Sequence, residues 1–267
     1  MEIVFLGTGG GRFNLVRQVR GTGGFRVNAR ELKMHVDPGP GALLRSLELR
    51  QSPLELDALF VSHSHVDHSN DANVLIEGMT EYTRKKRGVI IASPEVLEGG
   101  HAYISKYHQS LPKKCYSVEP GDTLELNGAR IEITPARHDA ESAVGFKLRA
   151  EGKILGYTGD TEYFDALGEI FAGCDLLIIN NLRPRDNGIP GHLTSDGVIK
   201  ILNVARNLSM GQMRICAKER KLRPNNSLIT HLGIEFTQKL AREEAARITR
   251  ESGIETRAAR DGMRVKL

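Results

Sequence analysis

Short apolar runs separated by turn residues predict strands that alternate with helices in the first third of the chain. The predicted strands are Met1–Leu6, Phe25–Asn28, Leu32–Asp37, Leu56–Val61 and Val89–Ala92. The predicted helices are Ala42–Arg50, Asp71–Arg87 and a polar helical stretch between Val89–Ala92 and Cys115. The basic residues Arg84–Arg87 at the end of the second helix favour a solvated cap that complements the helix dipole.

The rest of the chain repeats this pattern after a β-rich middle. The predicted strands are Thr123–Leu126, Arg130–Thr134, Val144–Arg149, Lys153–Tyr157, Leu176–Ile179, Leu228–Thr230, Glu255–Ala258 and Met263–Leu267. The predicted helices are Tyr163–Phe171, Thr194–Arg206 and Glu235–Ser252, and Ser209–Pro224 is basic and irregular. Strand and helix units in both halves indicate an α/β fold in which two sheets pack face to face with helices outside.

A glycine-rich loop, Gly7–Gly11, follows the first predicted strand. No Gly-Lys-Ser/Thr follows it, which excludes a P-loop, and no amphipathic helix is expected directly after it, which argues against a dinucleotide fingerprint. The loop is interpreted as a turn that gives the backbone room near a ligand. A phosphate cradle is the weaker alternative.

The most specific signal is the hexapeptide His63–His68, with three imidazoles and one carboxylate in six residues directly after Leu56–Val61. Helical spacing does not fit His63 and His65, which are two apart, so a tight turn at a strand end is expected. Imidazole and carboxylate suit zinc, manganese or iron. Four ligands in so short a segment exceed what one tetrahedral ion takes, which predicts two adjacent ions. A solvated histidine-rich loop is the disfavoured alternative.

Three further candidate ligands also follow predicted strands. His138 comes after Arg130–Thr134, Asp160 after Lys153–Tyr157, and His231 after Leu228–Thr230. Residues placed by chance would not all follow the ends of predicted strands. We therefore expect these side chains to complete the metal site.

Composition narrows the class of protein. The chain has 267 residues, 40% apolar and 26% charged, and we expect one domain over residues 1–267. No apolar stretch approaches about 18 residues and no signal-like leader follows Met1, so a cytoplasmic location without a membrane partner is expected. Three scattered cysteines argue against a disulfide framework. The net charge of +4 permits an anionic substrate.

The motifs together resemble the metallo-β-lactamase superfamily: His-x-His-x-Asp-His, then a single histidine, a Gly-Asp and a final histidine. The resemblance implies a four-layer αββα sandwich with a dinuclear metal site at the edge of the sheets. It implies that one metal is held by His63, His65 and His138, and the other by Asp67, His68 and His231. Asp160 would bridge the two ions.

Within that superfamily the chain looks most like the branch of ribonuclease Z and the cyclic phosphodiesterases of phosphonate breakdown. Three segments carry this likeness: Phe5–Gly10, Gly159–Thr161 and Gly191–Thr194. In these relatives a histidine matching His192 lies near the scissile phosphate. The alternative is that His192 is only a residue at the start of a helix, with Thr194 as the helix cap. Ribonuclease Z also carries a flexible arm. It has an acidic-histidine signature at the position where this chain has Asn180–Arg183.

These observations predict a hydrolase that uses a water activated by two divalent ions, with zinc favoured over manganese or iron. Asp67 and His192 are the expected catalytic residues, with Arg183 and Arg185 as possible anion contacts. The expected substrate is a small or nucleotide-derived phosphodiester. Alternatives are a lactonase or thioesterase, a tRNA 3′-processing endoribonuclease without the arm, and a non-catalytic RNA-binding module using Arg84–Arg87 and Lys218–Arg223. A homodimer is a further expectation.

Overall fold

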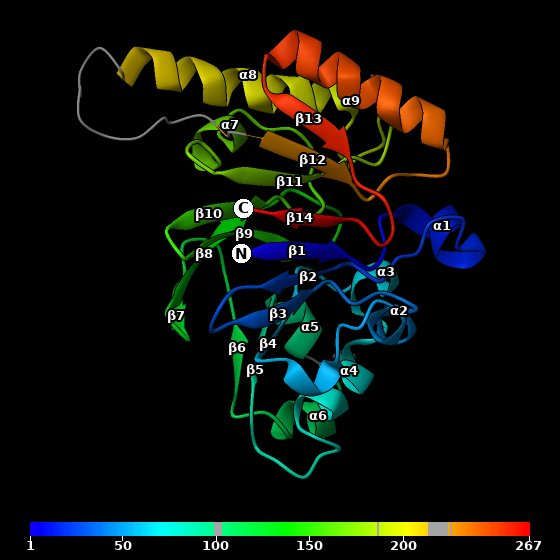
Figure 1. Cartoon of the computed structure of the whole chain (residues 1–267), viewed down its shortest axis with the longest axis vertical. Coiled ribbons are helices and arrows are strands. Elements are labelled where there is room, and N and C mark those ends of the chain that lie inside the picture. The colour runs from blue at the N-terminus through cyan, green and yellow to red at the C-terminus, as the bar shows by residue number, and fades with distance from the viewer. Residues whose placement is uncertain (99–102, 186, 213–223, 225) are drawn as a thin grey trace.

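The computed structural model has two seven-stranded β-sheets stacked face to face, with helices on the outer side of each (Figure 1). It describes residues 1–98, 103–185, 187–212, 224 and 226–267. The expected αββα sandwich is therefore confirmed.

The N-terminal sheet begins with the two ends of the chain side by side, because the first and last strands pair antiparallel. Its order is β14 (Arg264–Lys266), β1 (Glu2–Phe5), β2 (Phe25–Asn28), β3 (Lys33–Val36), β4 (Ala58–Val61), β5 (Val89–Ala92) and β6 (Lys114–Ser117). Strands β3 to β6 run parallel. Their carboxyl ends therefore meet at one edge of the sheet.

The C-terminal sheet has a parallel part and an antiparallel part. Its order is β13 (Glu255–Ala258), β12 (Asn226–Thr230), β11 (Leu176–Asn180), β10 (Lys153–Tyr157), β9 (Val144–Ala150), β8 (Ala129–Pro135) and β7 (Thr123–Leu126). Strands β10 to β13 are parallel, and β8 points the same way because two antiparallel pairings separate it from β10. The carboxyl ends of β8, β10, β11 and β12 thus share one edge.

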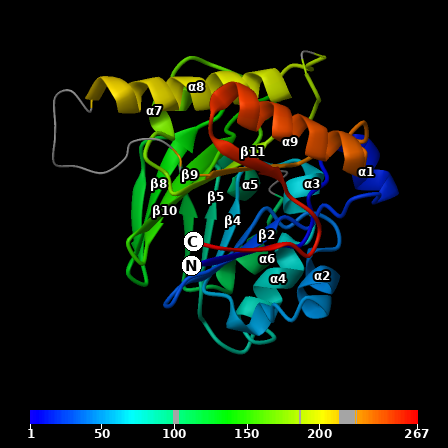
Figure 2. The same ribbon diagram turned by 45° about the horizontal axis from the view of Figure 1, so that its top comes forward.

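Helices cover both outer faces (Figures 1 and 2). On the N-terminal sheet these are α2 (Ala42–Glu48), α4 (Ala72–Met79), α5 (Pro94–Leu97) and α6 (Lys106–Ser110), and on the C-terminal sheet α7 (Leu167–Ile170), α8 (Ser195–Gln212) and α9 (Gln238–Ser252). Strand β4 is buried along its whole length because it lies between two apolar layers. Its Ala58 and Phe60 pack between the sheets, whereas Leu59 and Val61 pack under the helices.

Several local predictions were wrong. A short helix, α1 (Gly11–Arg17), follows the glycine loop where no helix was expected. Its only buried residue is Asn14, so the sequence lacks the apolar stripe that would reveal it. The helix expected to reach Arg87 ends at Met79, and Cys115 lies in strand β6 after two short helices.

The basic run Arg84–Arg87 therefore does not cap a helix. Arg87 lies instead beside β4, where it pairs with Asp57 and donates a hydrogen bond to the carbonyl of Leu56. The other basic segment proposed for RNA binding, Lys218–Arg223, is outside the described residues. No helix in the described part of the chain is long and apolar enough to cross a membrane.

Candidate metal centre

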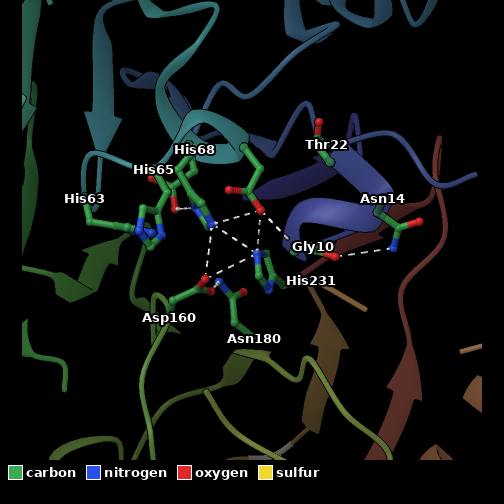
Figure 3. Close-up of polar contacts among 12 residues, drawn as sticks. Gly10, Asn14, Thr22, His63, His65, His68, Asp160, Asn180 and His231 are labelled. Atoms are coloured by element: carbon green, nitrogen blue, oxygen red, sulfur yellow. Dashed lines mark hydrogen bonds and ion pairs between the residues drawn. The ribbon is translucent and has the colours of Figure 1, made fainter. Parts of the chain in front are cut away.

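The seven predicted ligands meet where the carboxyl edges of the two sheets face each other. Figure 3 labels His63, His65, His68, Asp160 and His231 among them. His63 follows β4, His138 follows β8, Asp160 follows β10 and His231 follows β12. Parallel strands deliver the residues after their carboxyl ends to one place, which is why residues far apart in sequence converge. In Figure 3 the side chains of His68, Asp160 and His231 point toward one another.

One group of nitrogens comes from His63, His65 and His138, whose nearest ligand atoms all lie within 4.8 Å of one another. His65 Nδ1 is 3.0 Å from His138 Nε2. The other ring nitrogen of His138, Nδ1, donates to the carbonyl of Gly191 at 2.8 Å, which orients the ring.

A second group consists of Asp67, His68 and His231, again with ligand atoms within 4.8 Å of one another. His68 Nε2 lies 3.0 Å from His231 Nε2, and that atom lies 3.3 Å from Asp67 Oδ2. The two groups are the same two trios that the family resemblance implies.

Asp160 lies between the trios. Its Oδ2 is 3.3 Å from His68 Nε2, 3.3 Å from His231 Nε2 and 3.5 Å from His192 Nε2. It also groups with His63 on the buried side and with His138 on the open side. This central position is the one that a bridging carboxylate requires.

The hexapeptide is not a simple turn. His63 lies in a bend and His65 is extended, but α3 (Val66–Ser69) forms a single helical turn that carries Asp67 and His68. The hydroxyl of Ser69 donates to the carbonyls of Ser64 and His65 and closes this turn. The expectation of a non-helical segment was thus wrong for its second half.

The glycine loop packs directly against the centre. The N–H of Gly11 donates to Asp67 Oδ2 at 2.9 Å. A Cβ on Gly10 would lie 2.2 Å from His231 Nδ1, so any larger residue there would displace the imidazole. This close approach supports the interpretation of a loop that gives the backbone room at the site.

Asp37 contacts the proposed ligands and was not predicted from the sequence. It is buried, and its carboxylate accepts hydrogen bonds from Ser62 N–H (2.7 Å), Ser62 Oγ (2.7 Å), Tyr157 Oη (2.6 Å) and His68 Nδ1–H (2.9 Å). In sequence, Asp37 followed by Pro38 and Gly39 is typical of a turn, which hid this role.

Asn180 was missed as well. Its Nδ2 donates to Asp160 Oδ1 at 2.6 Å and to the Tyr157 hydroxyl at 3.0 Å. Together Asp37, Tyr157 and Asn180 connect His68 to Asp160 behind the ligands. We call this group the inner wall.

Burial and charge set the pKa values of the ring nitrogens. Burial lowers the pKa of His63 well below its usual value. Burial also opposes a charge on His68, but the carboxylates of Asp160 and Asp67 outweigh it and raise the pKa of His68 well above its usual value. A cation that binds His68 therefore has to displace a proton.

The pKa values of the two carboxylates are lowered. Burial opposes their ionisation, yet the nearby imidazoles hold the pKa of Asp67 and the pKa of Asp160 well below the usual range. Both groups are therefore anionic at neutral pH and available as ligands.

His192 lies in the cluster, half-buried, on the side open to solvent. Its Nδ1–H donates to the carbonyl of Pro190 at 3.1 Å, so Nε2 faces Asp160. Burial opposes its charge, but the hydrogen bond to Asp160 raises the pKa of His192. Thr194 Oγ1 accepts from Gly197 N–H at 3.2 Å and caps α8.

The two arginines suggested for anion contact differ. Arg183 lies at the edge of the centre and pairs with Glu235. Arg185 instead points to Glu244, a buried carboxylate on α9.

The residues present fit a pair of divalent cations. His63 Nε2 is buried and has no hydrogen-bond partner among the described residues, as expected for an atom that holds a metal. Nitrogen and oxygen donors of this kind suit zinc and related ions, and none of the groups contains a cysteine.

Comparison with known proteins agrees with this picture. The beta-lactamase superfamily domain matches residues 33–210. The chain is 40% identical to an uncharacterized protein of Methanocaldococcus jannaschii, over 100% of this chain and 95% of that one. It is 27% identical to ribonuclease Z of Mycobacterium bovis over 68% of this chain and 71% of that one. It is 26% identical to hydroxyacylglutathione hydrolase of Prochlorococcus marinus, over 68% of this chain and 70% of that one.

Solved structures share the fold. The metallo-beta-lactamase fold protein YhfI of Bacillus subtilis superposes with a TM-score of 0.77, at 20% identity and 99% coverage of both chains. A diphosphatase from the PhnP family has a TM-score of 0.66, at 18% identity, over 100% of this chain and 98% of that one.

Proposed function

This chain belongs to the metallo-β-lactamase superfamily, whose members are hydrolases, and we propose that it is a metal-dependent phosphodiesterase acting on a small or nucleotide-derived phosphodiester. The proposed ligands are the two trios described above, with Asp160 shared between them. Zinc is the proposed metal, and the imidazole and carboxylate donors suit manganese and iron as well.

The position of Asp160 carries the proposal. One oxygen, Oδ2, lies within 3.5 Å of imidazoles from both halves of the chain. A site built for one ion would not need a buried carboxylate between two sets of imidazoles. Two cations, if held by these residues, would suit reactions in which negative charge develops on both the attacking and the leaving oxygen.

A pair of divalent ions held there would lower the pKa of a water to about 7 and polarise a phosphoryl oxygen. The role of the chain is to orient the reactants. Asp67 is anionic and is held by Gly11 N–H and His231 Nε2, so its carboxylate orients the attacking water. The proton of that water passes to solvent, because the lowered pKa of Asp67 disfavours protonation of this carboxylate.

His192 acts on the leaving group. Its Nδ1–H is engaged by the carbonyl of Pro190, which turns Nε2 toward Asp160 and the open side of the centre. The hydrogen bond to Asp160 raises the pKa of His192, which favours a proton on Nε2. That proton passes to the leaving alkoxide as the bond to phosphorus breaks.

The test is metal content and activity together. Purified protein loaded with zinc is expected to hold about two ions per chain by plasma mass spectrometry. Asp67→Ala is expected to reduce kcat/KM for bis-p-nitrophenyl phosphate by about 100- to 10,000-fold. Asp122→Ala, which removes an exposed carboxylate at a turn beside β7, is the matched control. Full activity in Asp67→Ala would overturn the mechanism.

Two relatives suggest other substrates. Hydroxyacylglutathione hydrolase is a relative at 26% identity, which favours a thioester as the second candidate. Ribonuclease Z is a relative at 27% identity, which keeps RNA among the substrates to assay. Parallel assays on a phosphodiester, a lactone, a thioester and a precursor tRNA separate them. The proposal requires the phosphodiester to have the highest kcat/KM.

A further inference from the structure

A cleft of about 720 Å³ opens in front of the proposed ligands. His65, Asp67, Asp160 and His192 form one part of its lining. The rest comes mainly from α1, from Val66 on α3, and from the loop before His192. Its volume is in the range of small-molecule sites. A ligand in this cleft would therefore touch the proposed reacting groups directly.

The lining away from the metal ligands is apolar and exposed. Phe13 is 65% exposed, Val16 82%, Val66 45% and Ile189 39%. Single exposed apolar residues are ordinary, but a group of them around one hollow marks a binding surface. Helix α1 contributes two of the four because its apolar side faces outward instead of into the core.

The cleft also carries charged groups of both signs, because Asp67, Asp139 and Asp160 line it beside two arginines. Arg12 and Arg183 line it, and Arg12 has no ion pair among the residues that the structure describes. Arg183 pairs with Glu235. An apolar hollow with a free guanidinium beside a metal centre matches a ligand with one anionic group and one apolar group.

Building on the proposed function, we propose that the substrate is a phosphodiester in which one alcohol is a bulky apolar group, such as an aryl group. The phosphate lies beside His192, in front of the cations that the proposed ligands would hold, and the apolar group lies between Phe13 and Ile189. The occupant is part of the substrate because the same cleft contains Asp67, Asp160 and His192. An aromatic group is favoured because Phe13 offers an exposed ring for stacking.

The test uses esters that share one leaving group. Zinc-loaded protein is assayed on methyl, phenyl and naphthyl esters of p-nitrophenyl phosphate, with each kcat/KM divided by the rate of hydroxide-catalysed hydrolysis of the same ester. The normalised kcat/KM is expected to rise from methyl to naphthyl by about 10-fold or more, since more apolar surface is buried. Calorimetry with a non-hydrolysable naphthyl phosphonate measures binding independently of turnover.

Substitutions in the cleft test whether its apolar residues cause the preference for the larger esters. Phe13→Ala and Ile189→Ala are each expected to reduce the naphthyl-to-methyl ratio several-fold and to weaken binding of the naphthyl phosphonate. Leu44→Ala is the matched control, since Leu44 is also 65% exposed but lies on α2, outside the cleft. It is expected to leave the ratio at the wild-type value. Circular dichroism checks that each variant is folded.

The outcomes separate this inference from the proposed function. Hydrolysis of the methyl ester with an unchanged ratio across the series would overturn the inference and leave the phosphodiesterase standing. Hydrolysis of none of the esters would remove both. A dimer that Phe13→Ala dissociates, with the ratio unchanged, would make the cleft an interface between copies of this chain and would also overturn the inference.

Discussion

Behind the proposed ligands the inner wall is buried and polar, whereas the surface in front of them is exposed and apolar. Asp37 and Asn180 are each 3% exposed and Tyr157 is 2% exposed, and each is hydrogen-bonded to another member of the wall. On the open side Phe13 and Val16 are largely exposed, and neither is among the residues of the apolar core.

The difference assigns separate tasks to the two sides. Inner-wall groups contact His68 and Asp160 but do not line the cleft, so they act on the orientation of the ligands. Phe13, Val16 and the other exposed apolar residues line the cleft, so under the proposed function they would act on the substrate. Substitutions on the inner wall should therefore change metal affinity and stability, and those on the open side should change substrate preference.

The largest effect is expected for Asp37→Asn. Asparagine replaces one acceptor oxygen by an amide that opposes the donors of Ser62, Tyr157 or His68. Loss of such an outer partner typically costs about 10- to 100-fold in metal affinity. The unpaired buried groups should also lower the free energy of unfolding by about 3 kcal/mol or more. Chelator competition with zinc and chemical denaturation measure the two quantities.

The control for Asp37→Asn is Asp57→Asn. Asp57 precedes β4, at the end away from the metal centre, and accepts from Lys33 N–H at 2.9 Å. It should lose stability without losing zinc affinity. Equal zinc affinity in Asp37→Asn and the wild type would show that the inner wall does not orient the ligands.

A second, smaller effect concerns His35 on β3. His35 is fully buried beside Arg26, and its Nε2–H donates to the carbonyl of Gly23 at 2.9 Å. Burial, with a contribution from Arg26, lowers the pKa of His35 from 6.5 to about 3. Below pH 6.5 the unfolded chain therefore binds a proton that the folded chain does not. The contribution of His35 to stability is present above pH 6.5 and is lost as the pH falls toward about 3.

The variant His35→Gln isolates this contribution, because glutamine keeps a donor for Gly23 and does not titrate. Between pH 7 and pH 4.5 the metal-free wild type should lose about 2.5 kcal/mol more of its unfolding free energy than the variant. Denaturation at several pH values in a chelator measures the difference. Parallel curves for the two proteins would contradict the shifted pKa.

The metal ligands were accessible from the sequence because their signal is local. Three imidazoles in six residues need no knowledge of the fold, and His138, Asp160 and His231 each follow an apolar run. The structure brings all seven together, and their role as ligands stays a prediction. The inner wall was not accessible in the same way. Asp37 resembles a turn residue, and Asn180 becomes informative only when β10 and β11 are paired.

The fold was predictable for a related reason. Buried parallel strands such as β4 and β11 are continuous apolar runs, which sequence patterns detect. Helix α1 was missed because its apolar residues face the cleft instead of the core, so their spacing follows no core-facing period. The elements that deliver ligands are thus encoded by burial, whereas the element proposed to bind substrate is not.

The smallest effect is expected for Tyr157→Phe. It removes a hydroxyl that donates to Asp37 at 2.6 Å and accepts from Asn180 at 3.0 Å, but Asn180 keeps its bond to Asp160. The free energy of unfolding should fall by about 1–2 kcal/mol, and zinc affinity by less than about 10-fold. Tyr116→Phe, on the edge strand β6, is the control, since no hydrogen bond of its hydroxyl is present among the described residues. A loss of zinc affinity as large as that of Asp37→Asn would mean that the inner wall acts as one cooperative unit. Removal of one hydroxyl would then disturb the orientation of both ligands that the wall contacts.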